Sequence, residues 1–336
     1  MILDTAPSTS DAEAEIRHKR RRAARWLGGH GIEIGALNNP LEVPNGVSIS
    51  YVDRAPEREL RRQYGELASE RFVPIDIIGD AHDLSAIATE SVDFVIANHL
   101  LEHLEDPLRG LQEMTRVLRR NGVLYLALPD PRATFDRDRE LTSIEHVVTE
   151  FREGTSHTRE AHFTEWVATA EPLVEWMQAA GVGGGPERVR DLMKLDYSIH
   201  FHVWRPDTFL EVVSAARREA GVEMELVDFM PCNATGDIEF IFVFLKGVAS
   251  TPPAVPPLDA CDASAEFSAK LDAMAAEIKS LHDQIRAVHA SAEVAECGRR
   301  EAEARLAAIE ESRSWRMTAP LRRAVRIAAR GIGKRW

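Results

Sequence analysis

Between residues 31 and 130 the chain repeats one arrangement, in which a short apolar run is followed by polar residues and a connection. Such runs occupy 31–34, 49–53, the residues before Gly79, 92–97 and 122–129. Strands that alternate with connections in this way favour a parallel sheet. The repeat therefore predicts a doubly wound α/β fold built from five β/α units. Ligands of such folds bind at the carboxyl ends of the strands, so the polar residues there are candidates for a site.

The binding candidates stand at the ends of the first four runs or directly behind them: Glu33, Gly35, Ala36, Leu37, Asp53, Arg54, Asp80, Ala81, Asn98 and His99. Asp53 follows the first turn by about twenty residues, the spacing at which such folds place a carboxylate on a ribose. A carboxylate only accepts hydrogen bonds, so it can bind both ribose hydroxyls. The alternative for each acid is an ordinary surface carboxylate.

A second motif follows the fourth run, and its parts are Leu101-Glu102-His103, Asp106-Pro107, Glu113 and Arg116-Val117-Leu118. Together with the turn after Glu33, this motif resembles class I S-adenosylmethionine-dependent methyltransferases. The close match covers about the first 130 residues, and a looser one extends to about residue 247. The chain departs from the family where Leu37 and Asn39 replace two glycines, and where Arg120-Asn121-Gly122 replaces proline-glycine-glycine.

The resemblance implies a seven-stranded, mostly parallel Rossmann-like sheet with S-adenosyl-L-methionine as the cofactor. It implies that Glu33 helps to hold the methionine amino group and that Asp53 binds the ribose. Asp80 and Ala81 would meet the adenine, and the pair after the fourth strand would line the methionine end. Gly35 would let the backbone approach the cofactor closely.

Histidines are the candidates for a general base, because an unperturbed imidazole has a pKa near ~6.5. His200 and His202 lie two residues apart in a predicted extended segment, so both can face the cleft, and we assign them the catalytic role. The alternative is that one caps the next helix and the other is exposed. The resemblance gives His103 a structural role, and His157 and His162 are weaker candidates. A His200–His202 metal pair lacks a third ligand at a suitable spacing, so no metal is expected.

The chain divides into an N-terminal helix and leader (1–26), a catalytic domain (27–247) and C-terminal segments. Within the domain, 131–199 breaks the strand alternation and reads as an acceptor-side insertion, with a helix-like run over 160–180. Two last strands, over 222–228 and 237–245, are too close for a crossover and should pair antiparallel. The basic run Ile16–Arg22 is interpreted as a solvated helix face, or alternatively as a contact for an anionic partner.

Three C-terminal segments have different characters. Residues 248–262 are a proline-rich linker. Residues 263–312 keep one heptad register of apolar positions, which predicts a coiled coil and a homo-oligomer. Residues 313–336 are basic, amphipathic and tryptophan-bearing, which suits peripheral contact with an anionic membrane. The run Ser314–Arg322 also resembles a tail of bacterial polysaccharide-biosynthesis glycosyltransferases and methyltransferases. The alternative is a basic tail that neutralises the acidic body.

Composition narrows the classes of protein to which the chain can belong. A net charge of −13 argues against nucleic-acid binding. Cys232, Cys261 and Cys297 lie far apart, as expected for a reducing cytoplasm. No apolar run approaches the ~20 residues that span a bilayer. We therefore expect a cytoplasmic enzyme, peripheral at the inner membrane face through its tail.

The leading functional hypothesis is O-methylation of a sugar or lipid-linked glycan in surface polysaccharide biosynthesis. One alternative is a scaffold, in which the coiled coil and tail assemble a biosynthetic complex and the altered glycine motif weakens catalysis. Another is a methyltransferase of a different small molecule. A nicotinamide-dependent oxidoreductase is disfavoured, because Gly35–Pro40 lacks the GxGxxG pattern that places a pyrophosphate on a helix N-terminus.

Overall fold

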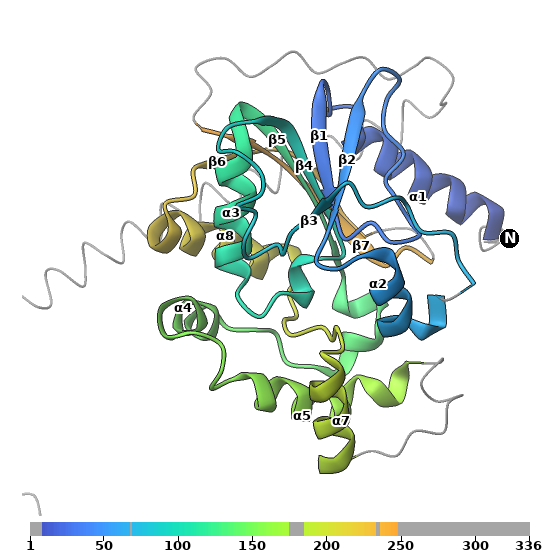
Figure 1. Cartoon of the computed structure of the whole chain (residues 1–336), viewed down its shortest axis with the longest axis vertical. Coiled ribbons are helices and arrows are strands. Elements are labelled where there is room, and N and C mark those ends of the chain that lie inside the picture. Colours follow the sequence, from blue (N-terminus) through green and yellow to red (C-terminus); the bar gives the residue numbers. More distant parts are fainter. Residues whose placement is uncertain (1–8, 68, 175–184, 233–235, 248–336) are drawn as a thin grey trace, which may run out of the picture. The chain divides into compact units, whose positions relative to one another are not determined.

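The computed structural model describes residues 9–67, 69–174, 185–232 and 236–247. Its centre is a seven-stranded sheet in the order β3-β2-β1-β4-β5-β7-β6 (Figure 1). The strands are β1 (His30–Ile34), β2 (Ser48–Asp53), β3 (Ile77–Ile78), β4 (Val92–Asn98), β5 (Leu118–Pro129), β6 (Met224–Met230) and β7 (Glu239–Lys246). Strands β1 to β5 pair in parallel, and β7 is antiparallel to both β5 and β6. The predicted sheet and its antiparallel last pair are confirmed.

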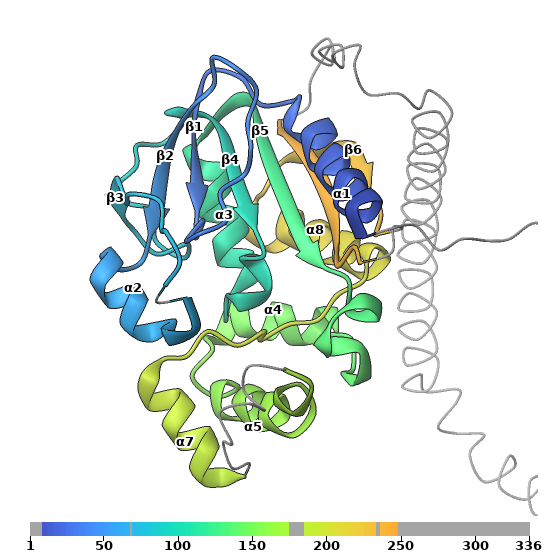
Figure 2. The ribbon, with the colours of Figure 1, turned by 90° about the vertical axis from the view of Figure 1, so that its right-hand side faces the viewer.

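The α-helices are α1 (Thr9–Ala24), α2 (Glu57–Gln63), α3 (Pro107–Val117), α4 (Ile144–Glu153), α5 (Arg159–Thr169), α7 (Pro186–Leu195) and α8 (Pro206–Ala220). Short 3-10 turns lie at Gly65–Leu67, Leu101–His103, Pro131–Ala133, Phe135–Asp138 and Glu171–Leu173. Helix α3 begins where its sequence favours it, since Asp106 accepts a hydrogen bond from the Arg109 amide and Pro107 occupies the first turn. Helices α3 and α8 pack together on one side of the sheet and α1 lies on the other (Figure 2).

The expected strand–helix alternation is wrong at two connections. Residues 35–47, between β1 and β2, contain no α-helix, and neither do residues 79–91, between β3 and β4. The first of these connections contains Pro40, Pro44 and Gly46, which favour turns over a helix. The parallel pairing therefore forms with extended crossovers instead of helical ones.

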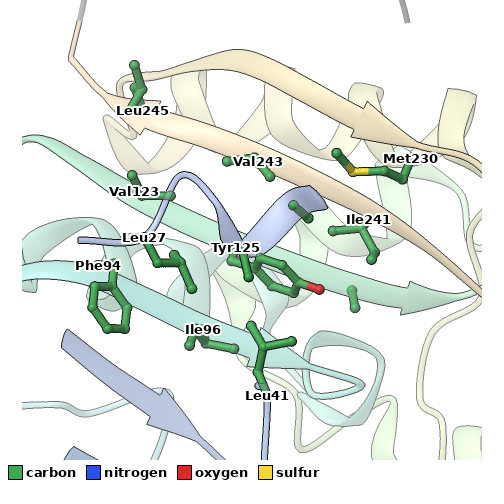
Figure 3. Close-up of a cluster of buried hydrophobic side chains, with 13 residues drawn as sticks. Leu27, Leu41, Phe94, Ile96, Val123, Tyr125, Met230, Ile241, Val243 and Leu245 are labelled. Atoms are coloured by element: carbon green, nitrogen blue, oxygen red, sulfur yellow. The ribbon is translucent and has the colours of Figure 1, made fainter. Parts of the chain in front are cut away.

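Apolar side chains from four strands (β4 to β7), from the α1 region and from the loop after β1 form one core (Figure 3): Ala23, Ala24, Leu27, Leu41, Phe94, Ile96, Val123, Tyr125, Ala127, Met230, Ile241, Val243 and Leu245. Burying a large apolar side chain of this kind stabilises a fold by ~1.5–3 kcal/mol. Gly31 allows β1 to approach β4, because a Cβ atom at this position would lie 2.3 Å from Cδ2 of the Phe94 ring. Alternate residues of β4, β5 and β7 thus point to the same side of the sheet and are buried there.

The basic run Ile16–Arg22 lies on α1, and the prediction that it is a solvated face is wrong for Lys19 and Arg20. The Lys19 ammonium donates to Asp237 over 2.5 Å, and the Arg20 guanidinium makes two bonds of 2.8 Å to Glu239. Only 5 % of the Lys19 side chain is exposed. The acids belong to the β6–β7 part of this same chain, so these two cations have intramolecular partners. The packed domain therefore begins before the expected boundary at residue 27.

The insertion forms a separate group of helices. Figures 1 and 2 show α4, α5 and α7 beyond the carboxyl ends of the parallel strands. They have their own buried cluster, whose members are Phe163, Trp166, Val167, Ala170, Val174, Val189, Leu192, Ile199 and Phe201. The helix expected over 160–180 ends as an α-helix at Thr169, and residues 175–184 lie outside the described residues. The insertion is therefore held by its own apolar contacts as well as by the sheet.

The proline-rich linker, the coiled coil and the basic tail expected over 248–336 lie outside the described residues. Within the part of the chain that the structure does describe, no helix combines the length and the apolar character needed to cross a bilayer.

Candidate functional site

A pocket opens at the carboxyl ends of β1, β2 and β4, between the sheet and the insertion. Seven of the predicted binding residues line it: Gly35, Leu37, Asp53, Arg54, Asp80, Ala81 and His99. The three others, Glu33, Ala36 and Asn98, are not among the described residues that line this pocket. Residues between 35 and 99 meet at this pocket because the parallel strands that precede them end at the same edge of the sheet.

The turn after β1 has an unusual backbone. Gly35 has a φ of 71°, and Leu37 has a φ of 49°. The first value is accessible to glycine at little cost, whereas the second is uncommon for a residue with a side chain. The Gly35 amide donates to the Val52 carbonyl over 2.9 Å, which joins the turn to β2. The turn therefore keeps the shape of a close-approach loop although Leu37 replaces the family's glycine.

Glu33 lies behind the pocket and is fully buried. Its carboxylate accepts from the Leu41 amide over 3.0 and 3.1 Å, and from the Asn98 amide group over 3.1 Å. Burial raises the pKa of Glu33 to about 7, against the lowering effect of these hydrogen bonds. The carboxylate therefore links the loop after β1 to the end of β4. It does not line the pocket itself and acts on it by holding these neighbouring residues.

Asp53 stands at the end of β2, with only 8 % of the residue exposed. One of its oxygens accepts from the Arg54 amide over 2.8 Å. Burial raises the pKa of Asp53 to about 6, despite the charge of the Arg54 guanidinium. A carboxylate at the pocket wall is an acceptor for hydroxyl groups, which fits a ribose.

Asp80 lies on the neighbouring loop. Its Oδ1 accepts from the His82 amide over 2.7 Å and lies 2.7 Å from Nδ1 of the same histidine. The hydrogen bond from the imidazole lowers the pKa of the Asp80 carboxyl, which therefore stays ionised. An ionised acceptor here suits the exocyclic amino group of an adenine.

His99 is bound by two acids. Its Nε2 lies 2.8 Å from Glu239 and its Nδ1 lies 3.6 Å from Glu102. Burial lowers the pKa of His99, but the interactions with the two carboxylates outweigh burial and raise the pKa to about 9. The imidazole is therefore charged at neutral pH. His99 adds a cation to the pocket wall and does not serve as a base.

The expectation that His200 and His202 face one cleft is wrong. His200 Nδ1 lies 2.6 Å from Asp136 Oδ2, whereas the His202 ring stacks on Trp204 with a centroid distance of 5.1 Å. Neither is among the described residues that line the pocket. Residues 197–205, which carry them, form neither a helix nor a strand, so the two-residue alternation of a strand does not apply.

The His202 side chain is fully buried among the insertion helices. Burial lowers the pKa of His202 to about 3 in spite of the nearby Glu150 carboxylate. Burial raises the pKa of Glu150, but hydrogen bonds from His146 and His162 outweigh it and hold that pKa well below its usual range. His202 therefore stays neutral over the physiological pH range.

His103, to which we gave a structural role, does line the pocket. Its Nδ1 lies 2.9 Å from the Ile199 carbonyl, so this nitrogen donates and Nε2 is left as an acceptor. Burial, and then the charge of His200, lower the pKa of His103 to about 4. The rings of His103 and His200 are in edge contact, with centroids 4.6 Å apart. A neutral imidazole therefore stands at the pocket wall.

The remaining pocket residues were not among the predicted ones: Ile34, Tyr64, Gly79, His82, Leu100, Leu104, Glu105, Arg159, Asp196, Tyr197, Ser198 and Phe201. Several come from the insertion, whose sequence has no strand repeat that would place them. Asp196 pairs with Arg54 across 3.1 Å and also with Arg159, and Arg159 contacts Glu105. These ion pairs join the insertion to the cofactor edge of the sheet, a link that only tertiary packing defines.

Comparison with known proteins finds a family match for part of the sheet segment. Residues 35–126 match the family described as Methyltransferase domain. An uncharacterized protein of Methanocaldococcus jannaschii is 26% identical over 118 residues, which are 35% of this chain and 52% of that protein. The chain thus spans about half the length of the curated relative that it matches.

Solved structures of methyltransferases also align with the chain. A SAM-dependent methyltransferase of Thermotoga maritima is 18% identical, with 70% of this chain and 91% of that chain covered and a TM-score of 0.37. A SAM-dependent methyltransferase of Aquifex aeolicus is 12% identical, with 70% and 89% covered and a TM-score of 0.33. Likeness at this level identifies no substrate.

The pocket residues are compatible with the cofactor of this family. Asp53 and Asp80 supply acceptors for hydroxyl and amino groups, and Gly35 leaves room for a close approach of the backbone. These features lie within or beside the segment that matches the family. The chain therefore contains a methyltransferase domain of the Rossmann-like type, and S-adenosylmethionine is the cofactor of that domain.

Proposed function

We propose that this protein transfers a methyl group from S-adenosylmethionine to a hydroxyl group of a sugar or lipid-linked glycan during the biosynthesis of surface polysaccharide. The observation that carries the methyl-transfer part is the pocket at the strand ends, where Asp53 and Asp80 lie beside the Gly35 turn. The glycan part is supported by the likeness of Ser314–Arg322 to tails of polysaccharide-biosynthesis enzymes. The proposed activity of the whole chain therefore combines the methyl transfer inferred from the pocket with the glycan acceptor inferred from the tail.

Each pocket residue is proposed to bind a different part of the cofactor. Bound S-adenosylmethionine supplies a methyl group on a sulfonium, so the protein mainly holds two reactants in line. Asp53 would hold the ribose hydroxyls and Asp80 the adenine amino group. The His99 cation would face the carboxylate of the methionine part. Glu33 would act behind the pocket by fixing the turn and Asn98.

The acceptor would enter from the side of the insertion, where Tyr197 and Ser198, and Phe201 just after it, line the pocket. A hydroxyl acceptor must lose its proton when the methyl group is transferred. His200 and His202, which we expected to act as the base, do not line the pocket, whereas His103, to which we gave a structural role, does. We therefore propose that Nε2 of His103 accepts a hydrogen bond from the acceptor hydroxyl, with Ser198 Oγ, 3.1 Å from its Nδ1, helping to orient the ring. Because its pKa is about 4, this imidazole is a weak base, and the proton would pass on to solvent.

The C-terminal segments would place the enzyme at its substrate. We propose that 263–312 form a coiled coil that makes a homo-oligomer, and that 313–336 contact an anionic membrane. Deletion of 263–312 should convert an oligomer into a monomer in sedimentation. The full chain should co-sediment with anionic vesicles at low salt, and a chain that ends at Glu311 should not. A monomeric full chain, or equal vesicle binding by both chains, would contradict these assignments.

The function is tested by mass spectrometry of surface glycans from cells with and without the gene. We expect cells without the gene to lose one methyl mass from a glycan component. The wild-type gene should restore this methyl group, and the Asp53→Ala gene should not. If Asp53→Ala restores it fully, the pocket does not carry the activity. If no glycan changes but purified protein still binds S-adenosylmethionine, the acceptor belongs to another class.

A further inference from the structure

A second cluster of polar side chains lies inside the insertion. His146 and Glu150 are four residues apart on α4, so they share one face of that helix. His162 comes from α5, and His202 from the extended segment that precedes α8. One ligand atom from each of these residues lies within 4.8 Å of the others. None of the four is among the described residues that line the cofactor pocket.

Three atoms of this cluster form a tight triangle. His146 Nε2 and His162 Nε2 are 3.0 Å apart, and they lie 3.1 and 2.8 Å from the same oxygen, Oε1 of Glu150. A neutral imidazole nitrogen carries either a proton or a lone pair, and a carboxylate oxygen only accepts. At most two sides of the triangle can therefore be hydrogen bonds. The third side always brings two protons or two lone pairs together.

A cation resolves this conflict. If all three atoms direct lone pairs at one ion, each side of the triangle becomes the edge of a coordination shell. Ligand atoms around a tetrahedral zinc ion, with bonds of about 2.0–2.1 Å, are roughly 3.3 Å apart. The sides of the triangle lie within a few tenths of an ångström of this value.

His202 completes the set. Its Nε2 lies 3.5 Å from Oε2 of Glu150, and both side chains are fully buried. Among the described residues, this Glu150 oxygen has no hydrogen-bond partner. A buried charged acceptor without a partner is destabilising, because it has lost its hydration and gained no hydrogen bond. The charge of an ion held by Oε1 would offset part of that cost, because Oε2 belongs to the same carboxylate.

We propose that His146, Glu150, His162 and His202 bind one divalent transition-metal ion of the zinc type. Three imidazoles and one carboxylate are ligands that zinc and its neighbours accept. Four protein ligands fill a tetrahedral shell, which is typical of a structural site. Phe201 lines both the cofactor pocket and the cavity beside His146 and His162. The ion would thus hold α4 and α5 against the segment that forms the acceptor wall.

The metal content of the untagged full-length protein tests this assignment. After dialysis against buffer with trace Zn²⁺, we expect about one zinc per chain by plasma mass spectrometry, as for other structural sites. His162→Gln and His146→Gln should each weaken zinc binding at least ~10-fold, since even residues behind metal ligands have effects of that size. The matched control is His157→Gln, an exposed histidine between α4 and α5 that is not in the cluster.

Two further readouts keep the test decisive if a variant folds poorly. Cobalt bound to the wild-type chain should give the intense visible absorption of a tetrahedral ion. A chelator should lower the melting temperature of the wild type and of His157→Gln, but not that of a folded His162→Gln. Zinc below a tenth of an equivalent, equal zinc in all variants, or a cobalt spectrum like that of the aqueous ion would overturn the proposal. Each outcome is independent of methyl transfer.

Discussion

The cofactor edge of the sheet and the insertion place their polar side chains by different means. At the cofactor edge, Asp53, Asp80 and His99 follow successive strands, and chain order alone brings them to one side of the sheet. In and directly after the insertion, His146, His162 and His202 come from two helices and a following loop without a repeating spacing. Chain order therefore places the first group, whereas tertiary packing places the second.

The two regions also have separate apolar cores. The sheet core is built around Phe94, Tyr125 and Ile241, and the insertion core around Phe163 and Trp166. A change in one core should therefore leave much of the other intact, and the following predictions use this separation.

The largest effect is expected from Phe163→Ala. Phe163 is fully buried in the insertion core, and removal of a phenylalanine side chain from a core costs about 3–5 kcal/mol. Hydrogen exchange should become faster in α5 and α7 while β4 and β5 stay protected. Thr164→Ala, at the exposed neighbouring position, should change stability by less than about 0.5 kcal/mol. Equal loss of protection in the sheet and the insertion would show that the two cores unfold together.

The next effect concerns pH. The folded-state pKa of Glu33, about 7, lies above the ordinary 4.5. The stability contribution of this group is therefore complete below pH 4.5 and is lost as the pH rises through 7. Glu33→Gln should be more stable than the wild type at pH 8, by up to about 3 kcal/mol, with a smaller difference at pH 5. Denaturant unfolding at both pH values measures this, and a difference that does not depend on pH would refute the assignment.

Asp53→Ala should act on the cofactor edge alone. The loss of hydrogen bonds to a charged group is expected to weaken S-adenosylmethionine binding by about 1.5–3 kcal/mol in titration calorimetry. Glu59→Ala, at an exposed acid on α2, is the matched control and should bind like the wild type. Unchanged affinity in a folded Asp53→Ala protein would remove this residue from the site.

The smallest effect is expected where the two regions meet. Asp196→Asn weakens the ion pairs with Arg54 and Arg159, and exposed pairs contribute about 0.2–1 kcal/mol. Asparagine tolerates the left-handed backbone of this position, where φ is 50°. The urea midpoint should therefore shift only slightly. A loss above 2 kcal/mol, beyond the range of exposed pairs, would mean that the ion pairs hold the insertion in place.

Much of the sheet could be predicted, because apolar runs and turns are local signals. The antiparallel β6–β7 pair followed from the shortness of its connection. Two crossover helices were wrongly expected, because the β/α repeat was extended over connections that contain turn-forming residues. The basic run on α1 was misinterpreted, because its acidic partners, Asp237 and Glu239, lie more than two hundred residues away in the chain.

At the site, too, only residues with a local sequence signal could be predicted. Residues behind strands, such as Asp53, were found from spacing, whereas Tyr197 and Phe201 had no such signal. The face of His202 could not be read from a two-residue alternation, because that segment joins no sheet and its ring stacks on Trp204. The third and fourth members of the His146–Glu150–His162–His202 cluster become visible only once α4 and α5 are packed together.

The most direct test of the central claim is a hydrogen-exchange footprint of S-adenosylhomocysteine on the full chain. We predict slower exchange in peptides that cover the Gly35–Leu37 turn, Asp53–Arg54, Asp80–His82 and the residues after β4. Exchange in α1, β6 and β7 should stay unchanged, since these elements lie away from the pocket. Absent protection at the strand ends, or protection confined to α1 and β6–β7, would contradict the proposed cofactor pocket.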